Sequence, residues 1–279
     1  MTYFTSNKLQ ELVDYRYLLQ NLVVRDLKVR YKNSILGVMW SLLNPLLMMI
    51  VFSLVFTFAL GDESIRQYPV FFLVGLIPWN FFNNALRSGT MSILTNASLI
   101  KKIYFPRELL PFAAVLSQLV NFGFSFIVLI LFLYIFGLGL TVHALWVIPL
   151  LITQVLFTLG LVLLMGSINV FYRDILMILD LGLLALFFLT PIVYPLDLFL
   201  NEQTLMGITF DPARVMRWVN PMASIVDGYR TVLWGTMASS GPSAMFVPYL
   251  VRTFVTSLIV FIVGYIVFLR TETWFGEIL

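Results

Sequence analysis

The sequence predicts an all-α integral membrane protein whose helices cross a bilayer six times. Of its 279 residues, 60% are apolar and only 11% are charged, whereas soluble domains carry about 25% charged residues. The mean hydropathy is +0.95, and long stretches of the chain carry no charge. Because so few charged side chains could not cover a water-facing surface, lipid is the solvent that fits this composition.

The expected spans follow from the uncharged stretches and the breaks between them. The 25 uncharged residues at 36–60 are enough to cross about 30 Å of hydrocarbon. The 64 uncharged residues at 109–172 are too many for one helix, and the glycines in 137–141 predict a fold-back. Pro191 and Pro195 predict a kink or break at the end of the fifth span. The six expected spans are 36–60, 68–86, 109–136, 144–172, 175–196 and 246–269.

The distribution of Lys and Arg predicts the orientation, because short loops rich in these residues stay inside. With the N-terminus inside, the inner segments hold twelve basic residues and the short outer loops hold only Arg66. Both termini are therefore expected in the cytoplasm, with the half-polar segment 197–245 outside. The first 34 residues contain no apolar stretch typical of a secretory signal, so no cleavable signal is expected. The expected organisation is an N-terminal interface segment at 1–35 and one transmembrane domain at 36–279.

An amphipathic interfacial helix is predicted within residues 1–35. On a helical wheel its polar residues gather on one side and its apolar residues lie opposite, while Arg16 and Arg30 intrude on the apolar side. The polar set is Asp14, Asn21, Arg25, Lys28 and Lys32, and the apolar set is Leu12, Leu19, Val23 and Leu27. Such a helix fits either a membrane-surface anchor or a docking surface for a cytoplasmic partner.

The connection at 96–106 is short, cytoplasmic by the expected orientation, and unusual in mixing charge with apolar side chains. Lys101 and Lys102 are followed at once by Ile103, Tyr104 and Phe105. These aromatic residues either mark the membrane interface or contact a partner. Composition alone leaves both interpretations open.

The outer segment 197–245 contains two helix starts in which a capping side chain precedes proline, Asp211-Pro212 and Asn220-Pro221. Apolar residues then repeat at helical spacing, and Asp227 and Arg230 stand three positions apart. The apolar repeat consists of Met222, Ile225, Val226, Tyr229 and Leu233. This pattern predicts an amphipathic helix, for which an ordinary surface helix is the simpler interpretation.

Ionisable residues inside the spans are costly, so each is a functional hypothesis. Asp180 lies near the cytoplasmic end of the fifth span, where a structural role is as well supported as substrate contact. Arg252 lies near the outer end of the sixth span and is expected either to snorkel or to meet a lipid phosphate. His143 stands beside the outer turn and is not expected to relay protons.

Four stretches of the sequence, 25–40, 44–46, 101–108 (Lys-Lys-Ile-Tyr-Phe-Pro-Arg-Glu) and 220–230, carry a family resemblance. The chain resembles the permease subunits of polysaccharide, O-antigen and teichoic-acid exporters, which are type-two ATP-binding-cassette (ABC) transporters. This resemblance implies a homodimer that pairs with two copies of a cytoplasmic ABC ATPase. It also implies that 96–106 is the coupling helix seated in the ATPase. The residues expected to couple to the ATPase are Ser98, Lys101, Lys102, Tyr104, Phe105 and Arg107, together with Arg25, Lys28 and Arg30 of the N-terminal helix.

The same resemblance implies the cargo and its path. The cargo would be a polysaccharide linked to polyprenyl phosphate, such as O antigen, capsule or teichoic acid, crossing the bacterial inner membrane. The first and fifth spans of each copy would separate at the dimer seam, and short re-entrant helices in 197–245 would gate the exit. The channel or gate candidates are Trp40, Phe52, Phe56, Phe187, Tyr194, Asp227, Tyr229 and Arg230, and Arg252 is the lipid-phosphate candidate.

Energy is expected to come from outside this chain. No Gly-Lys dipeptide occurs, so the usual phosphate-binding loop of nucleotide hydrolases is absent and ATP and Mg would bind to the partner ATPase. Cysteine is absent, and neither a cofactor, a metal nor a nucleic-acid partner is expected. Three alternatives remain: an exporter of another lipid or a drug, an ATP-independent flippase, and a membrane glycosyltransferase. The single acid within the spans and the scattered outer acids disfavour the last two.

Overall fold

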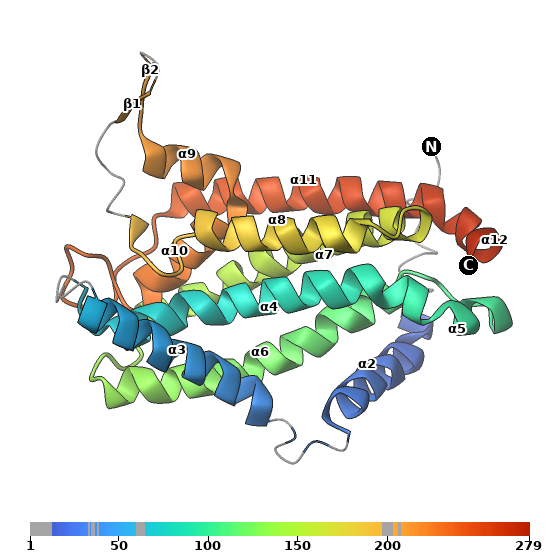
Figure 1. Cartoon of the computed structure of the whole chain (residues 1–279), viewed down its shortest axis with the longest axis horizontal. Helices are drawn as coiled ribbons and strands as arrows, with labels where there is room; N and C mark the ends of the chain where they lie inside the picture. Colours follow the sequence, from blue (N-terminus) through green and yellow to red (C-terminus); the bar gives the residue numbers. More distant parts are fainter. Residues whose placement is uncertain are drawn as a thin grey trace.

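The computed structural model describes residues 13–32, 34, 37, 39–59, 65–196, 203–205 and 208–279. The start of the predicted interface helix, including Leu12, lies outside these residues. So do both ends of the predicted first span and parts of the outer segment. The chain is a helical bundle whose long helices run side by side along the longest axis (Figure 1). These helices are α3 (Met39–Ala59), α4 (Tyr68–Thr95), α6 (Leu109–Ile135), α7 (Val147–Phe171), α8 (Ile175–Leu189) and α11 (Val247–Thr271).

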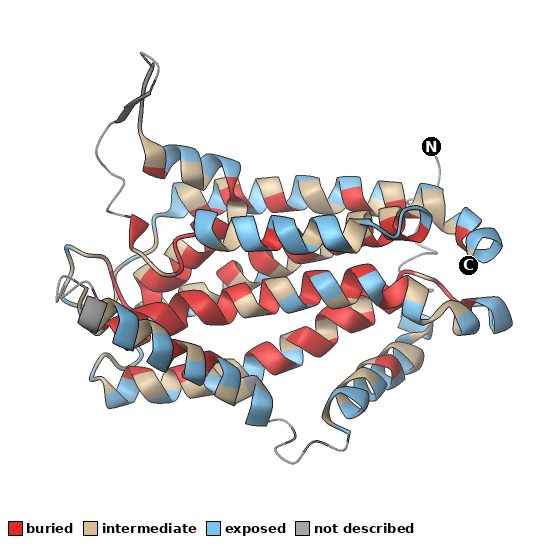
Figure 2. Cartoon of the chain, in the orientation of Figure 1, coloured by how far each residue is buried: buried red, intermediate tan, exposed pale blue. Residues whose placement is uncertain are grey.

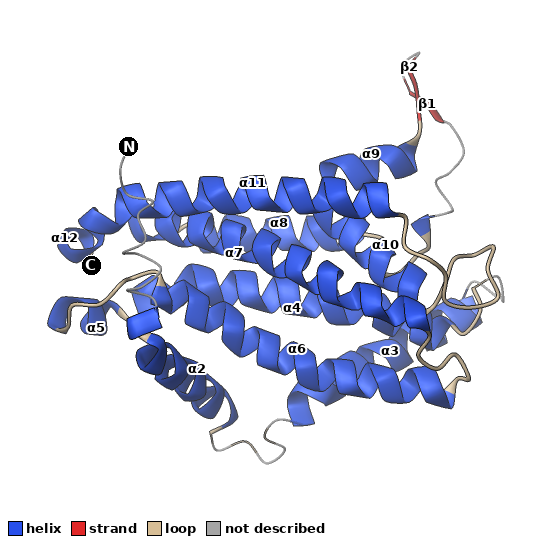
Figure 3. Cartoon of the chain, turned by 180° about the vertical axis from the view of Figure 1, so that it is seen from behind, coloured by secondary structure: helices blue, strands red, loops and turns tan. Residues whose placement is uncertain are grey.

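Shorter elements lie at the ends of the bundle. One end carries the exposed helix α5, and the other carries a β-hairpin that stands away from the helices (Figure 3). The shorter helices are α2 (Arg16–Tyr31), α5 (Ala97–Lys102), η1 (Val142–Trp146), α9 (Pro212–Val219), α10 (Pro221–Leu233), η3 (Glu272–Trp274) and α12 (Phe275–Ile278). The hairpin pairs β1 (Gln203–Leu205) with β2 (Ile208–Phe210) in antiparallel register, Thr204 opposite Thr209. It is the one departure from a helical chain in the described part of the sequence.

Helix α4 forms the centre of the bundle. It is buried along most of its length and packs against α3, α6, α7 and α10 (Figure 2). The central aromatic side chains, such as Phe72 and Phe82, are completely buried within the largest hydrophobic cluster. Burial on all sides explains why the first part of α4, residues 68–79, is apolar all round rather than on one face.

Close backbone packing joins α7 to α11. A Cβ atom added to Gly264 would lie 2.1 Å from the carbonyl oxygen of Gly160, and one added to Gly160 would lie 2.6 Å from the Cα of Phe261. Only glycine at these two positions allows such an approach. Small residues at helix contacts are how membrane helices gain packing energy, because lipid supplies no hydrophobic drive for their association.

Four helical segments in the described residues are long and apolar enough to cross a membrane: 68–102, 109–135, 142–171 and 247–278. Two shorter apolar helices, 42–56 and 175–189, correspond to the predicted first and fifth spans. The helical prediction is therefore confirmed, with four to six candidate spans. The fold-back at 137–141 is confirmed as well, and Gly137 and Gly139 adopt φ values of 76° and 62° there.

Two predicted boundaries differ from the structure. Helix α4 continues to Thr95 rather than ending at 86, and the hydroxyls of Ser88 and Thr95 donate to carbonyls one turn back within the extension. Helix α8 ends at Leu189 instead of 196. Since Pro191 has no N–H to donate and restricts the residue before it, the helix stops where the prolines predict a break.

Candidate functional site

The connection between α4 and α6 projects from one end of the bundle. Residues 97–102 form α5, and Ile103 continues in an extended conformation, so the helix is shorter than the predicted 96–106. Ser98, Lys101 and Lys102 are exposed, and Tyr104 is 84% exposed, the largest fraction among the exposed large apolar residues. The adjacent Ile103 is 57% exposed, so the two side chains form an apolar patch on a charged loop, which is a feature of contact surfaces.

Phe105 points the other way. Its side chain is only 4% exposed and joins a second hydrophobic cluster with Leu22, Leu109, Phe268 and Phe275. Phe105 is therefore not on the exposed face of the loop, and its expected coupling role stays a prediction that rests on this packing. Since the exposed Tyr104 and the buried Phe105 are adjacent, the loop is anchored to α2, α6, α11 and α12 directly behind its exposed face.

Polar contacts strengthen this anchor. Arg107 donates a hydrogen bond to the backbone carbonyl of Glu272, in the turn after α11. Glu108 is fully buried and accepts a hydrogen bond of 3.3 Å from the hydroxyl of Tyr265. Arg107 thus forms a hydrogen bond within its own chain. The sequence did not indicate this contact, because Arg107 and Glu272 are 165 positions apart. The role of Glu108 and Tyr265 was missed for the same reason.

Helix α2 packs against α6 through Leu22, and its two last residues turn toward the same helix. Arg30 donates to Oε1 of Gln118 at 3.0 Å, and the Tyr31 hydroxyl donates to Oδ1 of Asn121 at 2.6 Å. Arg25 pairs with the neighbouring Asp26, and Lys28 is exposed. Arg30 therefore lies on the side facing the bundle, whereas Arg25 and Lys28 remain open to a partner.

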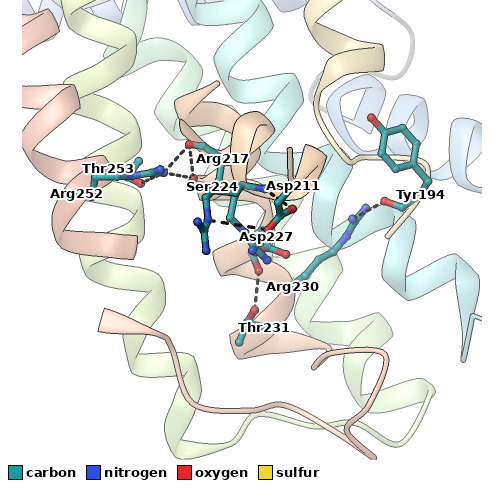
Figure 4. A network of polar contacts seen from close by, with 10 residues as sticks. Tyr194, Asp211, Arg217, Ser224, Asp227, Arg230, Thr231, Arg252 and Thr253 are labelled. Atoms are coloured by element: carbon teal, nitrogen blue, oxygen red, sulfur yellow. Dashed lines mark hydrogen bonds and ion pairs between the residues drawn. The ribbon is translucent and has the colours of Figure 1, made fainter. Parts of the chain in front are cut away.

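At the opposite end of the bundle, Arg230 of α10 holds the break that follows α8 (Figure 4). Its side chain is 4% exposed and lies 3.6 Å from the ring centroid of Phe71. It donates hydrogen bonds to the backbone carbonyls of Ile192 and Tyr194. These carbonyls have no helical partner after the prolines, so the buried guanidinium supplies the donors that they need. Gly75 makes room, since a Cβ there would lie 2.9 Å from Nη2.

Asp227 and Arg230 point to different partners although they are three positions apart. Asp227 forms an ion pair of 3.1 Å with Arg217 of α9, which ties α9 to α10. Arg252 of α11 donates from Nη2 to the Arg217 carbonyl and to the Ser224 hydroxyl (Figure 4). The Arg252 guanidinium also lies 4.8 Å from the ring centroid of Trp218. Both predicted caps are confirmed: Asp211 accepts from the N–H of Arg214 and Asn220 from that of Met222, each at 3.0 Å.

The aromatic channel candidates differ in exposure. Trp40 on α3 is half exposed, but Phe52 and Phe56 of the same helix stack on Phe72 and Tyr68 of α4, at 4.7 and 4.8 Å. Their rings therefore face the bundle. Phe187 makes an edge contact with Trp79, whereas its neighbour Phe188, absent from the predicted set, is 63% exposed.

Two further channel or gate candidates, Tyr229 and Tyr194, are buried or partly buried by the rest of the chain. Tyr229 is fully buried in the main cluster and lines no open surface in this conformation, and its expected role in the channel or gate stays a prediction. Tyr194 is partly buried, and its hydroxyl donates to the Phe188 carbonyl. Helical spacing identified the apolar face of α10, but the sequence alone did not show that this face is covered by α4 and α7.

An apolar helical bundle with long membrane-span candidates is the architecture of a multi-pass membrane protein. No three His, Asp or Glu side chains gather as metal ligands in the part of the chain that the structure describes. The family model for ABC-2 type transporters matches residues 17–234, and the chain belongs to this family.

Relatives with assigned names agree with the family. The chain is 33% identical over 267 residues to the O-antigen export system permease protein RfbA of Klebsiella pneumoniae, covering 94% of this chain and 96% of that protein. It is 34% identical over 225 residues to the protein of the same name from Myxococcus xanthus, covering 81% and 83%. The chain is thus a multi-pass permease subunit of an ABC-2 type exporter, which works with an ATPase partner and has neither an ATPase site nor a cofactor of its own.

Proposed function

We propose that this permease forms a homodimer that exports a polyprenyl-phosphate-linked polysaccharide across the bacterial inner membrane, driven by two copies of the ATPase. The names of the relatives favour O antigen as the cargo. The observation that carries the transport mechanism is the contrast between the 84% exposure of Tyr104 and the 4% exposure of Phe105 in one loop. Such a loop presents one face to a motor and transmits its displacement through the other.

The proposed topology has six spans with both termini in the cytoplasm. Residues of α2, α5, α11 and α12 meet in the second hydrophobic cluster, which places segments near both termini beside the coupling loop. An even number of crossings is needed for this arrangement. Helix α8, with 15 residues, reaches only about 22 Å of the roughly 30 Å of hydrocarbon. The segment 190–196 would complete that crossing, held by Arg230.

The dimer seam is proposed to lie along α3 and α8. Both helices contact α4, and both present rows of exposed apolar side chains in the single chain (Figures 1 and 2). Leu183 is the one fully buried residue among those described in α8. A second copy would cover part of these rows, and the glycan would pass between the copies when the seam opens, beside Trp40 and Phe188.

The proposed exit gate consists of α9, α10 and the segment after α8. Arg230 joins α10 to that segment, and the Arg217–Asp227 pair joins α9 to α10. These contacts make one connected unit that moves together when α8 moves. Arg252 links this unit to α11 through Nη2, and its Nη1 atom is buried without a hydrogen-bond partner among the described residues. Lipid phosphate contact by Arg252 therefore requires α9 or α10 to move away and uncover the guanidinium.

The coupling role is tested by a double variant, Lys102→Ala with Tyr104→Ala, expressed together with the ATPase in cells that lack the native permease. We expect export of the lipid-linked glycan to be lost while membrane insertion and expression are retained, because both side chains project from the fold. Tyr134→Ala is the matched control, since Tyr134 is 60% exposed at the other end of α6. Full export by the double variant would refute the coupling role.

A further inference from the structure

A cavity of about 360 Å³ lies between α2, α3, α4 and α6, apart from both the coupling loop and the exit gate. Its volume falls within the range of about 300–1,000 Å³ that small-molecule sites occupy. Asn84 and Asn121 line it near the middle of α4 and α6, and Arg30 lines it from the end of α2. Polar side chains at this depth in a membrane bundle are costly to bury without partners, and a cation there is a hypothesis for a functional site.

Side-chain amides dominate the cavity wall. Asn44, Asn80 and Asn84 all line it, and their side chains make no hydrogen bond to any residue in the described part of the chain. Each amide offers two donors and an acceptor with two lone pairs. Three amides from two helices, none of which bonds to a described residue, form a wall suited to a ligand rich in hydroxyl groups.

Arg30 adds a positive charge to the wall of the cavity. Gln118 and Asn121, which are only 2% and 8% exposed, hold the end of α2 through Arg30 and Tyr31. Gln118 accepts from Arg30 with Oε1, which leaves the other guanidinium N–H groups available. No acidic side chain lines the cavity among the described residues. A cation without a neighbouring acid favours an anionic group, and arginine suits phosphate in particular.

We propose that this cavity binds the sugar-phosphate end of the lipid-linked glycan before transport, with Arg30 on the phosphate and Asn80 and Asn84 on the first sugar. This inference rests on the proposed function and names the part of the cargo that is recognised. The Trp40 ring, which also lines the cavity, provides an apolar face for the sugar. A zwitterionic phospholipid head group would bring its ammonium group close to the like charge of Arg30, and phosphatidylglycerol would leave several amides without partners.

The test measures lipid binding to the purified permease–ATPase complex by native mass spectrometry. The probes are synthetic polyprenyl-phosphate-linked glucose, polyprenyl phosphate without sugar, and phosphatidylglycerol. The amide variant is Asn80→Ala with Asn84→Ala, which leaves no protein partner unsatisfied because neither side chain bonds to a described residue. Asn83→Ala is the matched control, since Asn83 is the neighbour of Asn84 and does not line the cavity.

We expect the amide variant to bind the glucose-bearing lipid about tenfold more weakly, as the loss of two hydrogen bonds implies, and to bind polyprenyl phosphate as the wild type does. Arg30→Gln should weaken the binding of both polyprenyl lipids. The control variant Asn83→Ala should bind both of them as the wild type does. Unchanged binding of the glucose-bearing lipid to the amide variant would overturn the inference and leave the proposed function intact. If the amide variant lost its binding of phosphatidylglycerol to the same extent, the cavity would be a general phospholipid site, and the proposed recognition of the sugar would be overturned. If the wild type bound neither polyprenyl lipid, the proposed function would fail with the inference.

Discussion

Arg87 of α4 and Asp180 of α8 form an ion pair in which Nη2 and Oδ1 lie 2.6 Å apart. Asp180 is the acid that the sequence places inside the fifth span, and its partner is a basic residue of another helix. Both side chains are 50% exposed in the single chain. Few side chains of α8 are buried. The Arg87–Asp180 ion pair and the contact between the Trp79 and Phe187 rings therefore hold α8 against α4. Asp180 thus has a partner within the chain, which favours a structural role over substrate contact.

The ion pair predicts a specific pattern of export activity. Asp180→Asn and Arg87→Gln should lower glycan export to a similar extent, and the double variant should be no worse than either single one, because both remove one interaction. The free energy of unfolding should change by less than about 1 kcal/mol, since half-exposed pairs contribute little. Exchange of the two residues, Arg87→Asp with Asp180→Arg, should restore part of the export. Additive losses with no recovery on exchange would show that the two residues act separately.

Arg230 predicts a stability effect at the gate. Arg230→Met leaves the carbonyls of Ile192 and Tyr194 without their donor, so the free energy of unfolding should fall by about 3 kcal/mol. Thermal unfolding of the purified complex measures the change. Arg214→Met is the control, because Arg214 is 73% exposed on α9 and reaches Asp211 only at 4.0 Å. Equal stability of the two variants would contradict the role of Arg230 as the donor that holds this segment.

The glycine contact between α7 and α11 predicts a packing effect. Gly264→Ala brings a Cβ against the carbonyl oxygen of Gly160, so the helices must separate and stability should fall by about 1–3 kcal/mol. Gly123→Ala should instead be neutral or stabilising by up to about 1 kcal/mol, because nothing lies within 4 Å of its Cβ and alanine favours helix. Melting curves of the two variants distinguish a steric cause from a general effect of replacing glycine.

Local chemistry made much of the fold predictable. Uncharged stretches predicted the apolar helices, and Pro191 predicted the end of α8. Asp211 and Asn220 predicted the starts of α9 and α10. Each of these residues acts on its immediate neighbours in the sequence, so a local pattern is enough to predict its effect. The strand pair of 203–205 and 208–210 was not predicted, since two strands of three residues carry too little alternation to form a recognisable pattern.

The direction of individual side chains was less predictable, because it depends on contacts between distant segments. Composition does not distinguish the exposed Tyr104 from the buried Phe105. The sequence placed Arg230 three positions from Asp227 and did not indicate its burial, which follows from Phe71 and the space at Gly75. The hydrogen bond between Arg30 and Gln118 joins residues 88 positions apart, which no local pattern indicates.

The central claim, that the exposed loop faces a cytoplasmic motor, is tested most directly by labelling a single cysteine. The chain contains no cysteine, so Tyr104→Cys introduces the only reactive thiol. Cytoplasmic coupling predicts no reaction with a membrane-impermeant maleimide in intact spheroplasts, reaction in inverted membrane vesicles, and protection there when the ATPase is bound. Labelling of Cys at this position in intact spheroplasts would contradict both the orientation and the coupling role.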